Sequence, residues 1–306
     1  MNPPLVSIVM RSFNEGWALA QTLPALRAQS YSHWELIVID SGSTDGSCDL
    51  IRAANPAYFV QIKPHEYNPS RVLNHGMGLA RAQFVVFLNA DATPQGPNWL
   101  RPLAEALLDP ATAAVFGRQI PRPDCSAVYA HDYHRCFGEQ RESADWEHFF
   151  SMVSSGLRKD IWSKRGFREE MQYSEDDEYT RWCRAKGYRV VYVPESVVMH
   201  SHNYTPGQAY KRSFGEAKAL AAVWNRAPGE INWPRTVLLG WLNDVRRDIV
   251  YCKRNKRLAE IPYAARIRWK QRRARLAGFK EGWRFYQRDA DHNPVRSFQI
   301  DGASGS

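Results

Sequence analysis

The sequence has few cysteines and no long apolar run, and each shortage excludes a class of protein. Its five cysteines in 306 residues include no C-x-x-C pair. That argues against a disulfide scaffold or a cysteine-rich metal cluster and favours a reducing compartment. No stretch approaches the roughly 20 uninterrupted apolar residues of a membrane span. The start, MNPPLVSIVM, lacks a basic segment before its apolar run, so we expect no signal peptide and a cytoplasmic protein.

Acidic residues are scarce in one part of the chain only. The net charge is +9, and residues 246–288 contain 15 Lys and Arg against 3 Asp and Glu. This surplus exceeds the net charge of the whole chain, so the remaining residues are slightly acidic. The basic character therefore belongs to the C-terminal region.

Apolar runs that alternate with helical spacings predict an α/β fold. Strands are expected at residues 5–11, 35–39, 58–63, 84–88, 113–120 and 188–193, with helices between most of them. This order is typical of a doubly wound, mostly parallel sheet flanked by helices. Residues 121–150 are expected to be rich in loops, and the chain beyond residue 206 mostly helical.

Polar residues follow three of the expected strands, at the edge where open α/β sheets bind ligands. The turn at 12–15 follows the first strand, and Asp40 follows the second. A carboxylate at Asp40 can accept hydrogen bonds from a base or a ribose, or it can cap its own turn. Asp91 comes after the apolar run FVVFL. It suits a divalent ion that bridges phosphate oxygens, or it caps the next helix.

The consecutive acids of residues 175–178 begin an expected helix. Acids at a helix start suit the helix dipole. Crowded carboxylates also become more basic, and we interpret Asp176 as a general base assisted by Glu175 or Asp177. His200 and His202 alternate along an extended segment and share a face. One of them completes a metal site with Asp91, or both are structural.

These pieces, in this order, resemble the inverting GT-A-fold glycosyltransferases of family 2. The likeness covers roughly residues 5–215. It rests on SIVMRSFNE, on VIDSGSTDGS, on Asn74-x-Gly76 placed 17 residues before Asp91, and on Glu175-Asp176 ahead of Gly187. The stretches KPHEYNPSRVLNHG, SSGLRKDIW and VMHSHNYTPGQAYKRSFGE are similar to the rhamnosyltransferase branch. That branch usually has H-G-R-T-R-N where this chain has residues 69–74 as PSRVLN.

The resemblance implies a role for each candidate residue. A nucleotide diphosphate sugar is the implied donor, and Mg²⁺ or Mn²⁺ the implied cofactor. The metal position of the D-x-D motif is Asp91, with His200, 24 residues after Asp176, as a further ligand. Asp176, with Glu175, takes the proton of the acceptor hydroxyl. The donor-binding set is Ser12, Phe13, Asn14, Glu15, Asp40, Ser41, Arg71, Asn74, Asn89 (at the first D-x-D position) and Ala90.

The implied domain plan has three parts. Residues 1–215 are the expected GT-A catalytic domain, with a donor half at 1–120 and an acceptor half at 121–215. Residues 216–298 are the expected basic helical extension, and residues 299–306 a flexible tail. The implied acceptor is a saccharide or a lipid-linked saccharide of bacterial surface polysaccharide synthesis. The possibility of a homo-oligomer stays open.

The basic extension carries aromatic and aliphatic side chains at helical intervals, namely Trp269, Leu276, Phe279, Trp283 and Tyr286. A basic amphipathic segment of this kind, within residues 246–288, suits an anionic membrane on the inner face of the plasma membrane. It is equally typical of a helix that packs on the catalytic domain with its basic side in solvent. Gly278 and Gly282 weaken a continuous helix here.

Two other functions compete with glycosyl transfer. A nucleotidyltransferase would carry a Gly-rich basic phosphate loop near its start, and SFNEGWA is not one. A nucleic-acid-binding protein would use the basic tail with its interleaved aromatics. The slightly acidic balance of the first 245 residues argues against nucleic acid as a partner.

Overall fold

A computed structural model describes residues 4–139, 148–224 and 231–289. The described chain forms two compact units. The first comprises the described parts of residues 1–122, 133–171 and 175–201, and the second those of 123–132, 172–174 and 202–306. All five cysteines are free. Among the described helices, none is both long and apolar enough to cross a membrane.

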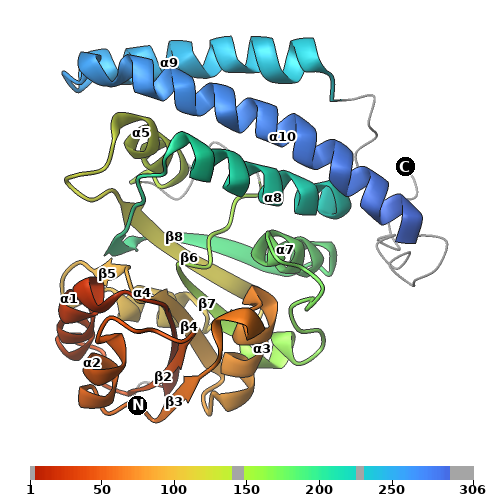
Figure 1. Cartoon of the computed structure of the whole chain (residues 1–306). Coiled ribbons are helices and arrows are strands. Elements are labelled where there is room, and N and C mark those ends of the chain that lie inside the picture. Colours follow the sequence, from red (N-terminus) through yellow and green to blue (C-terminus); the bar gives the residue numbers. More distant parts are fainter. Residues whose placement is uncertain (1–3, 140–147, 225–230, 290–306) are drawn as a thin grey trace. The chain divides into compact units, whose positions relative to one another are not determined.

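The first unit is built on one eight-stranded sheet in the order β3-β2-β1-β4-β7-β6-β8-β5 (Figure 1). Its strands are β1 Val6–Ser12, β2 Trp34–Asp40, β3 Tyr58–Gln61, β4 Phe84–Asn89, β5 Thr93–Pro94, β6 Thr112–Ile120, β7 Ser154–Arg158 and β8 Arg189–Met199. Strands β3, β2, β1 and β4 are mutually parallel, as are β6 and β8, whereas β7 and β5 run antiparallel to their neighbours. The expected α/β fold with a mostly parallel sheet is confirmed.

Helices cover both faces of this sheet because its central strands are apolar on both sides. They are α1 Gly16–Arg27, α2 Ser47–Ala53, α3 Pro69–Leu79, α4 Leu100–Ala106, α6 Lys159–Trp162 and α7 Glu175–Ala185, with a 3-10 turn η1 at Pro64–Glu66. Neighbouring residues of β1 separate into two cores: Ile8 packs in one with Leu19 and Leu103, and Val9 in the other with Leu73. The two cores fix the sheet between its helices.

Several elements depart from the sequence expectation, and two of them have a clear physical reason. Residues 127–136, expected as loop, form helix α5 Ala127–Cys136. The backbone N–H of Ala127 donates to the Glu260 carboxylate at 2.6 Å, a partner 133 residues away that no local pattern reveals. The second element is β7, whose sequence SSGLR carries little apolar signal. It pairs between β4 and β6, and a Cβ at Gly156 would lie 2.9 Å from the Leu107 side chain.

The second unit is helical. Helices α8 Pro206–Trp224, α9 Gly240–Arg254 and α10 Ile261–Asp289 are joined by a π-helical turn η3 at Trp233–Leu239 and a 3-10 turn η4 at Leu258–Glu260. Within this unit α10 lies between α8 and α9 (Figure 1). The domain boundary expected at residue 215 stays a prediction, because a compact unit in the structure does not show that the segment folds independently. The tail expected at 299–306 lies outside the described residues.

Helix α10 is continuous, contrary to the expectation that its glycines weaken it. A Cβ at Gly278 would lie 2.2 Å from the Phe214 carbonyl oxygen, and one at Gly282 would lie 2.2 Å from the Lys218 carbonyl oxygen. These glycines therefore allow α10 to approach the backbone of α8 closely. Leu276 and Phe279 are buried in the same packing. They are not available as membrane anchors, and the side chain of Tyr286 lies outside the described set.

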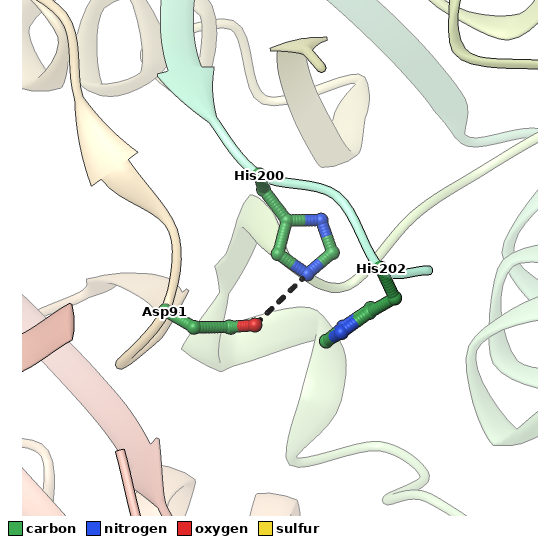
Figure 2. A group of neighbouring side chains, drawn as sticks. All are labelled: Asp91, His200 and His202. Carbon is green, nitrogen blue, oxygen red and sulfur yellow. Dashed lines mark ion pairs between the residues drawn. The ribbon is translucent and has the colours of Figure 1, made fainter. Parts of the chain in front are cut away.

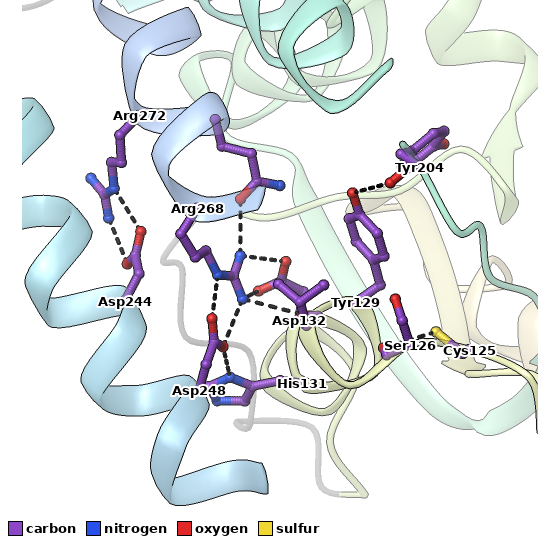
Figure 3. A network of polar contacts seen from close by, with 12 residues as sticks. Cys125, Ser126, Tyr129, His131, Asp132, Tyr204, Asp244, Asp248, Arg268 and Arg272 are labelled. Atoms are coloured by element: carbon purple, nitrogen blue, oxygen red, sulfur yellow. Dashed lines mark hydrogen bonds and ion pairs between the residues drawn. The ribbon is translucent and has the colours of Figure 1, made fainter. Parts of the chain in front are cut away.

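A buried ionic network ties α5, α9 and α10 together (Figure 3). Arg268 donates from Nε to Asp248 at 2.7 Å and from Nη1 to Asp132 at 2.8 Å. His131 Nδ1 lies 2.6 Å from the other oxygen of Asp248. A second pair joins Arg272 to Asp244 at 2.6 Å. Because each buried charge has an opposite partner, the network specifies how these three helices pack.

Close packing of α8 on α10 predicts opposite effects for two glycine-to-alanine substitutions. Gly278→Ala should lower the free energy of unfolding by about 1–3 kcal/mol, because its methyl group would collide with the α8 backbone. Gly207→Ala, in the first turn of α8, meets no atom within 4 Å. It should be neutral or stabilising by up to about 1 kcal/mol. Thermal unfolding followed by circular dichroism compares the two, and equal effects would contradict the close approach.

Candidate active site

The register of the parallel strands brings candidate residues to one edge of the sheet. Ser12 at the end of β1 lies opposite Asp40 at the end of β2, and Arg11 lies opposite Asn89 at the end of β4. Carboxyl ends of parallel strands form the ligand crevice of open α/β folds. The candidate site is therefore built at the carboxyl ends of β1, β2 and β4.

The loops that follow β1 and β2 are bonded to each other. Asn14 accepts a hydrogen bond from the Thr44 N–H at 2.8 Å, and its own N–H donates to the Ser43 hydroxyl at 2.8 Å. The N–H of Gly16, the first residue of α1, donates to Asp45 at 2.9 Å. Asn14 holds the left-handed conformation, with φ 54°. The two loops thus form one surface at the strand ends.

Asp40 caps its own turn, which is one of the two roles expected for it. Its buried carboxylate accepts from the N–H groups of Gly42 at 3.0 Å and Ser43 at 2.8 Å. Ser12, its neighbour in register, is also buried, and its hydroxyl has no hydrogen-bond partner. A buried hydroxyl without a partner is costly unless a ligand satisfies it. Binding of a ligand by Ser12, expected from the sequence, stays a prediction that this unsatisfied hydroxyl supports.

Arg11 connects the end of β4 to helix α7. Its guanidinium donates to the Asn89 side chain at 2.9 Å and lies 4.0 Å from the Glu175 carboxylate. Its carbonyl oxygen accepts from the Ala90 N–H at 3.0 Å. Asn89, expected at a donor-binding position, thus uses its amide oxygen to orient an arginine.

Asp176 lies in the first turn of α7, next to two acids that have ion-pair partners. Glu175 faces Arg11, and buried Glu178 pairs with Arg165. Asp176 accepts from the Asp177 N–H at 2.9 Å. Burial raises the pKa of Asp176 above its ordinary value, while this N–H and the Arg11 charge act in the opposite direction. A carboxyl with a raised pKa is a better proton acceptor than an ordinary aspartate.

Asp176 and Asp91 lie at the same strand end. The backbone of Met152 hydrogen-bonds Asp176, and the carbonyl of the next residue, Val153, accepts from the Asn89 N–H at 3.0 Å. Asn89 is two residues before Asp91. Asp91 and Asp176 are 85 residues apart in the sequence. Both nevertheless lie close to the backbone of residues 152 and 153.

Asp91 faces His200, which directly follows β8 (Figure 2). His200 Nε2 lies 3.5 Å from an oxygen of Asp91, and both side chains are buried. His202 follows two residues later, and one ligand atom from each of the three side chains lies within 4.8 Å of the others. The expected pairing of His200 with Asp91 is present.

The other ring nitrogen of His200 is held in place. Nδ1 lies 2.9 Å from Gln119 Oε1 and 3.0 Å from the Tyr133 hydroxyl. The Gln119 oxygen can only accept, so Nδ1 carries a proton and, in the neutral ring, the lone pair of Nε2 points toward Asp91. A lone pair facing a carboxylate is repulsive unless a proton or a cation lies between them.

This donor set fits a divalent cation. Two ligand atoms bound to one metal at about 2.1 Å lie roughly 3.0–3.4 Å from each other, and the Asp91–His200 pair is close to that at 3.5 Å. One carboxylate with one or two imidazoles suits Mn²⁺ better than Mg²⁺, which prefers oxygen ligands. The contact of His200 with Gln119 is of the kind that orients metal-binding histidines in other proteins.

Two other expected donor residues make contacts within the protein. Asn74 accepts from the Phe167 N–H at 2.9 Å and donates to the Phe167 carbonyl at 2.8 Å. Arg71 pairs with Glu169 at 3.2 Å. Both hold the segment that follows α6. A direct contact of either residue with a donor stays a prediction.

Arg122 belongs to the site, although it was not singled out from the sequence. It follows β6, and its guanidinium donates to the Asp91 carbonyl at 2.5 Å and stacks 4.1 Å from the centre of the Trp17 ring. Its Nε is buried and has no hydrogen-bond partner. Its position directly after a strand, in Pro121-Arg122-Pro123, is a weak signal for this sheet edge that does not specify a neighbour.

Comparison with known proteins identifies relatives of this chain. Residues 7–193 match the family model of glycosyl transferase family 2. The O-antigen chain rhamnosyltransferase RfbN of Salmonella typhimurium is 28% identical over 220 residues, which cover 68% of this chain and 70% of that protein. WbaN of Salmonella anatum, which bears the same description, is 29% identical over 69% of this chain and 70% of its own.

Solved structures share the fold at lower identity. The mannosyltransferase PcManGT from Pyrobaculum calidifontis, in complex with GDP-Man and Mn²⁺, superposes with a TM-score of 0.56 at 19% identity, over 98% of this chain and 79% of that one. TarS of S. aureus, in complex with UDP, superposes with a TM-score of 0.54 at 16% identity, over 92% of this chain and 91% of the TarS chain. At these identities the likeness shows the fold alone.

Glu15 predicts a pH dependence of stability. Burial and the nearby charge of Asp91 raise the pKa of Glu15 from 4.5 to about 8. Its contribution to folding is therefore complete below pH 4.5 and is lost as the pH rises through about 8. Because one pKa unit is about 1.4 kcal/mol, the loss amounts to a few kcal/mol at most.

Glu15→Gln should reduce this alkaline loss, measured as the unfolding temperature on both sides of pH 8. Glu105→Gln, which removes an exposed carboxylate of α4, is the matched control and should follow the wild type. If Glu15→Gln loses stability at high pH as steeply as the wild type, Glu15 is not the titrating group.

Proposed function

Because this chain belongs to glycosyl transferase family 2, we propose that it transfers a sugar from a nucleotide diphosphate sugar to a saccharide or lipid-linked saccharide, with inversion at the anomeric carbon. The observation that carries the proposal is the Asp91–His200 pair at the carboxyl end of β4, next to the Met152–Val153 backbone that hydrogen-bonds Asp176 and Asn89. Family membership also argues against the nucleotidyltransferase and nucleic-acid-binding alternatives.

We infer that the donor lies over the joined loops after β1 and β2. The unsatisfied hydroxyl of Ser12 is available to its polar groups. Arg122 supplies a positive charge and a guanidinium edge beside Asp91. A guanidinium binds phosphate oxygens through paired N–H donors. Phe13, which is 49% exposed next to Ser12, offers an apolar contact to the base or the sugar.

Asp91 and His200, with His202, are the residues that would hold a divalent cation. When bound, the cation supplies positive charge that stabilises the diphosphate as a leaving group. Among the similar structures, the mannosyltransferase complex contains Mn²⁺, which agrees with the histidine-containing donor set of this chain.

Asp176 acts as the general base in this proposal. The acceptor hydroxyl oxygen forms a bond to the anomeric carbon while the bond from that carbon to the diphosphate oxygen breaks. The hydroxyl proton passes to the Asp176 carboxylate, and the electron pair of the broken bond leaves with the diphosphate. The raised pKa of Asp176 favours this proton transfer. Glu175 keeps Arg11 in position beside it.

The donor sugar proposed for this chain is rhamnose. Two curated relatives that match more than two thirds of the chain are O-antigen chain rhamnosyltransferases. The acceptor would then be a growing surface polysaccharide. Release of the nucleotide from a panel of nucleotide sugars tests this choice, and a clear preference for another sugar would contradict it.

Asp176→Asn should lower turnover by a factor of about 10² to 10⁴, because the amide cannot accept the hydroxyl proton. Donor binding should be unchanged, since the substitution removes no group assigned to the donor. Sugar transfer measured by product formation, together with nucleotide binding by calorimetry, separates the two effects.

The matched control is Asp177→Asn, which changes the adjacent carboxylate in the same helix turn. Asp177 lies near Arg184, so this variant should keep most of its turnover. Near-native turnover in Asp176→Asn, or an equal loss in both variants, would show that Asp176 is not the base.

His200→Ala should weaken Mn²⁺ binding by about tenfold or more, because it removes a preoriented imidazole. Calorimetric titration of the free protein with Mn²⁺ measures this without any turnover. His75→Ala removes an exposed imidazole of α3 and is the control. If His200→Ala binds Mn²⁺ as tightly as the control does, the ion is held elsewhere.

A further inference from the structure

Helix α9 has one face that packs on α10 and one that does not. Within the second unit α10 lies between α8 and α9, and α9 contacts α10, η3 and η4 (Figure 1). The exposed residues of α9 and the end of η3 recur every three or four positions: Leu239, Leu242, Asn243, Arg246, Arg247, Val250, Lys253 and Arg254. Such spacing defines a single helix face. We call this set the outer face of α9.

Both acidic residues of α9 point away from the outer face. Asp244 pairs with Arg272 of α10 at 2.6 Å, and Asp248 pairs with Arg268 at 2.7 Å (Figure 3). The buried ion pairs therefore fix the rotation of α9 about its axis. As a result, the outer face contains four basic residues and no acidic one.

Large aliphatic side chains alternate with these basic residues. Leu239, Leu242 and Val250 are 59%, 49% and 43% exposed. The apolar surface continues into η3, where Trp233 is 48% and Leu238 is 38% exposed. Leu238 also lines a shallow groove with Trp241, Ala265, Arg266 and Trp269. Large exposed apolar side chains that gather on one helix and the turn before it are typical of an interaction surface.

The charge of the outer face selects among possible occupants. In a two-fold dimer the same face meets itself, so its four basic residues would oppose one another. Nucleic acid would satisfy the arginines but leave the leucines and the valine without an apolar partner. An anionic lipid surface satisfies both, because basic side chains reach the headgroups while aliphatic ones enter the acyl boundary.

We propose that the outer face of α9, together with Trp233 and Leu238 of η3, docks on membranes that contain anionic lipids. The sequence predicted a possible membrane contact through residues 246–288 with apolar anchors in α10, but Leu276 and Phe279 of that helix are buried. The outer face of α9 supplies exposed aliphatic side chains in their place. The inference goes beyond the proposed function and depends only on the surface of the helical unit. A lipid-linked acceptor would be met at the same membrane.

Flotation of the full-length protein with vesicles tests the proposal. The wild type should bind vesicles of phosphatidylcholine with phosphatidylglycerol and should not bind phosphatidylcholine alone. Leu239→Glu combined with Leu242→Glu should reduce the bound fraction about tenfold or more, as should Arg246→Glu with Arg247→Glu. The matched control is Leu50→Glu with Leu108→Glu, two exposed leucines of the first unit, and it should bind like the wild type.

Circular dichroism confirms that each variant is folded, and nucleotide release in solution is measured separately. Loss of vesicle binding with normal nucleotide release is the expected result for the α9 variants. The proposal is overturned if the wild type does not bind anionic vesicles, or if the control pair loses as much binding as the α9 pairs. It is also overturned if the two leucine substitutions leave vesicle binding unchanged and instead convert a dimeric wild type into a monomer, which light scattering would detect.

Discussion

The parallel pairing of β1 with both β2 and β4 is the constraint on which the rest of this protein depends. It aligns Ser12, Asp40 and Asn89 at one edge of the sheet, so the loops that follow these strands become neighbours. Arg11 then crosses from β1 to Asn89 and faces Glu175. The backbone beside Asn89 also contacts the segment that hydrogen-bonds Asp176. A shift of one residue in the register would send these side chains to the opposite face of the sheet.

Several charged and polar groups at this edge are buried or partly buried at a cost in folding free energy. Glu15 is partly buried near the Asp91 charge and has a raised pKa, and the Nε2 of His200 faces Asp91 across 3.5 Å. Burial of the charged form of Glu15 costs folding free energy. Buried polar atoms of Ser12 and Arg122 that lack a partner lie at the same edge. A ligand that brings positive charge and hydrogen-bonding groups would offset these costs, in agreement with our proposal that the donor binds at this edge.

In the helical unit, ion pairs between α9 and α10 determine which residues of α9 are exposed. Arg268 and Arg272 hold both aspartates of α9 on the side that faces α10. The basic and aliphatic residues of α9 are thereby left on the other side. Helix packing also depends on the close approach of α10 to the α8 backbone at Gly278 and Gly282. One set of interactions thus both stabilises the helices and exposes the face proposed to bind lipid.

The sequence by itself determined the fold class, the family resemblance and the candidates that follow strands, because apolar runs and short motifs are local properties of the chain. Strands β1, β2 and β4 and the positions of Asp40, Asp91 and Asp176 were predictable for this reason. Strand β7, with its polar sequence, and helix α5, whose start is bonded to distant Glu260, were not. Only the tertiary structure decided that Arg122 lies beside Asp91, that Gln119 orients His200, and which side of α9 is exposed. Each of these depends on contacts between residues far apart in the chain, and no local pattern encodes them.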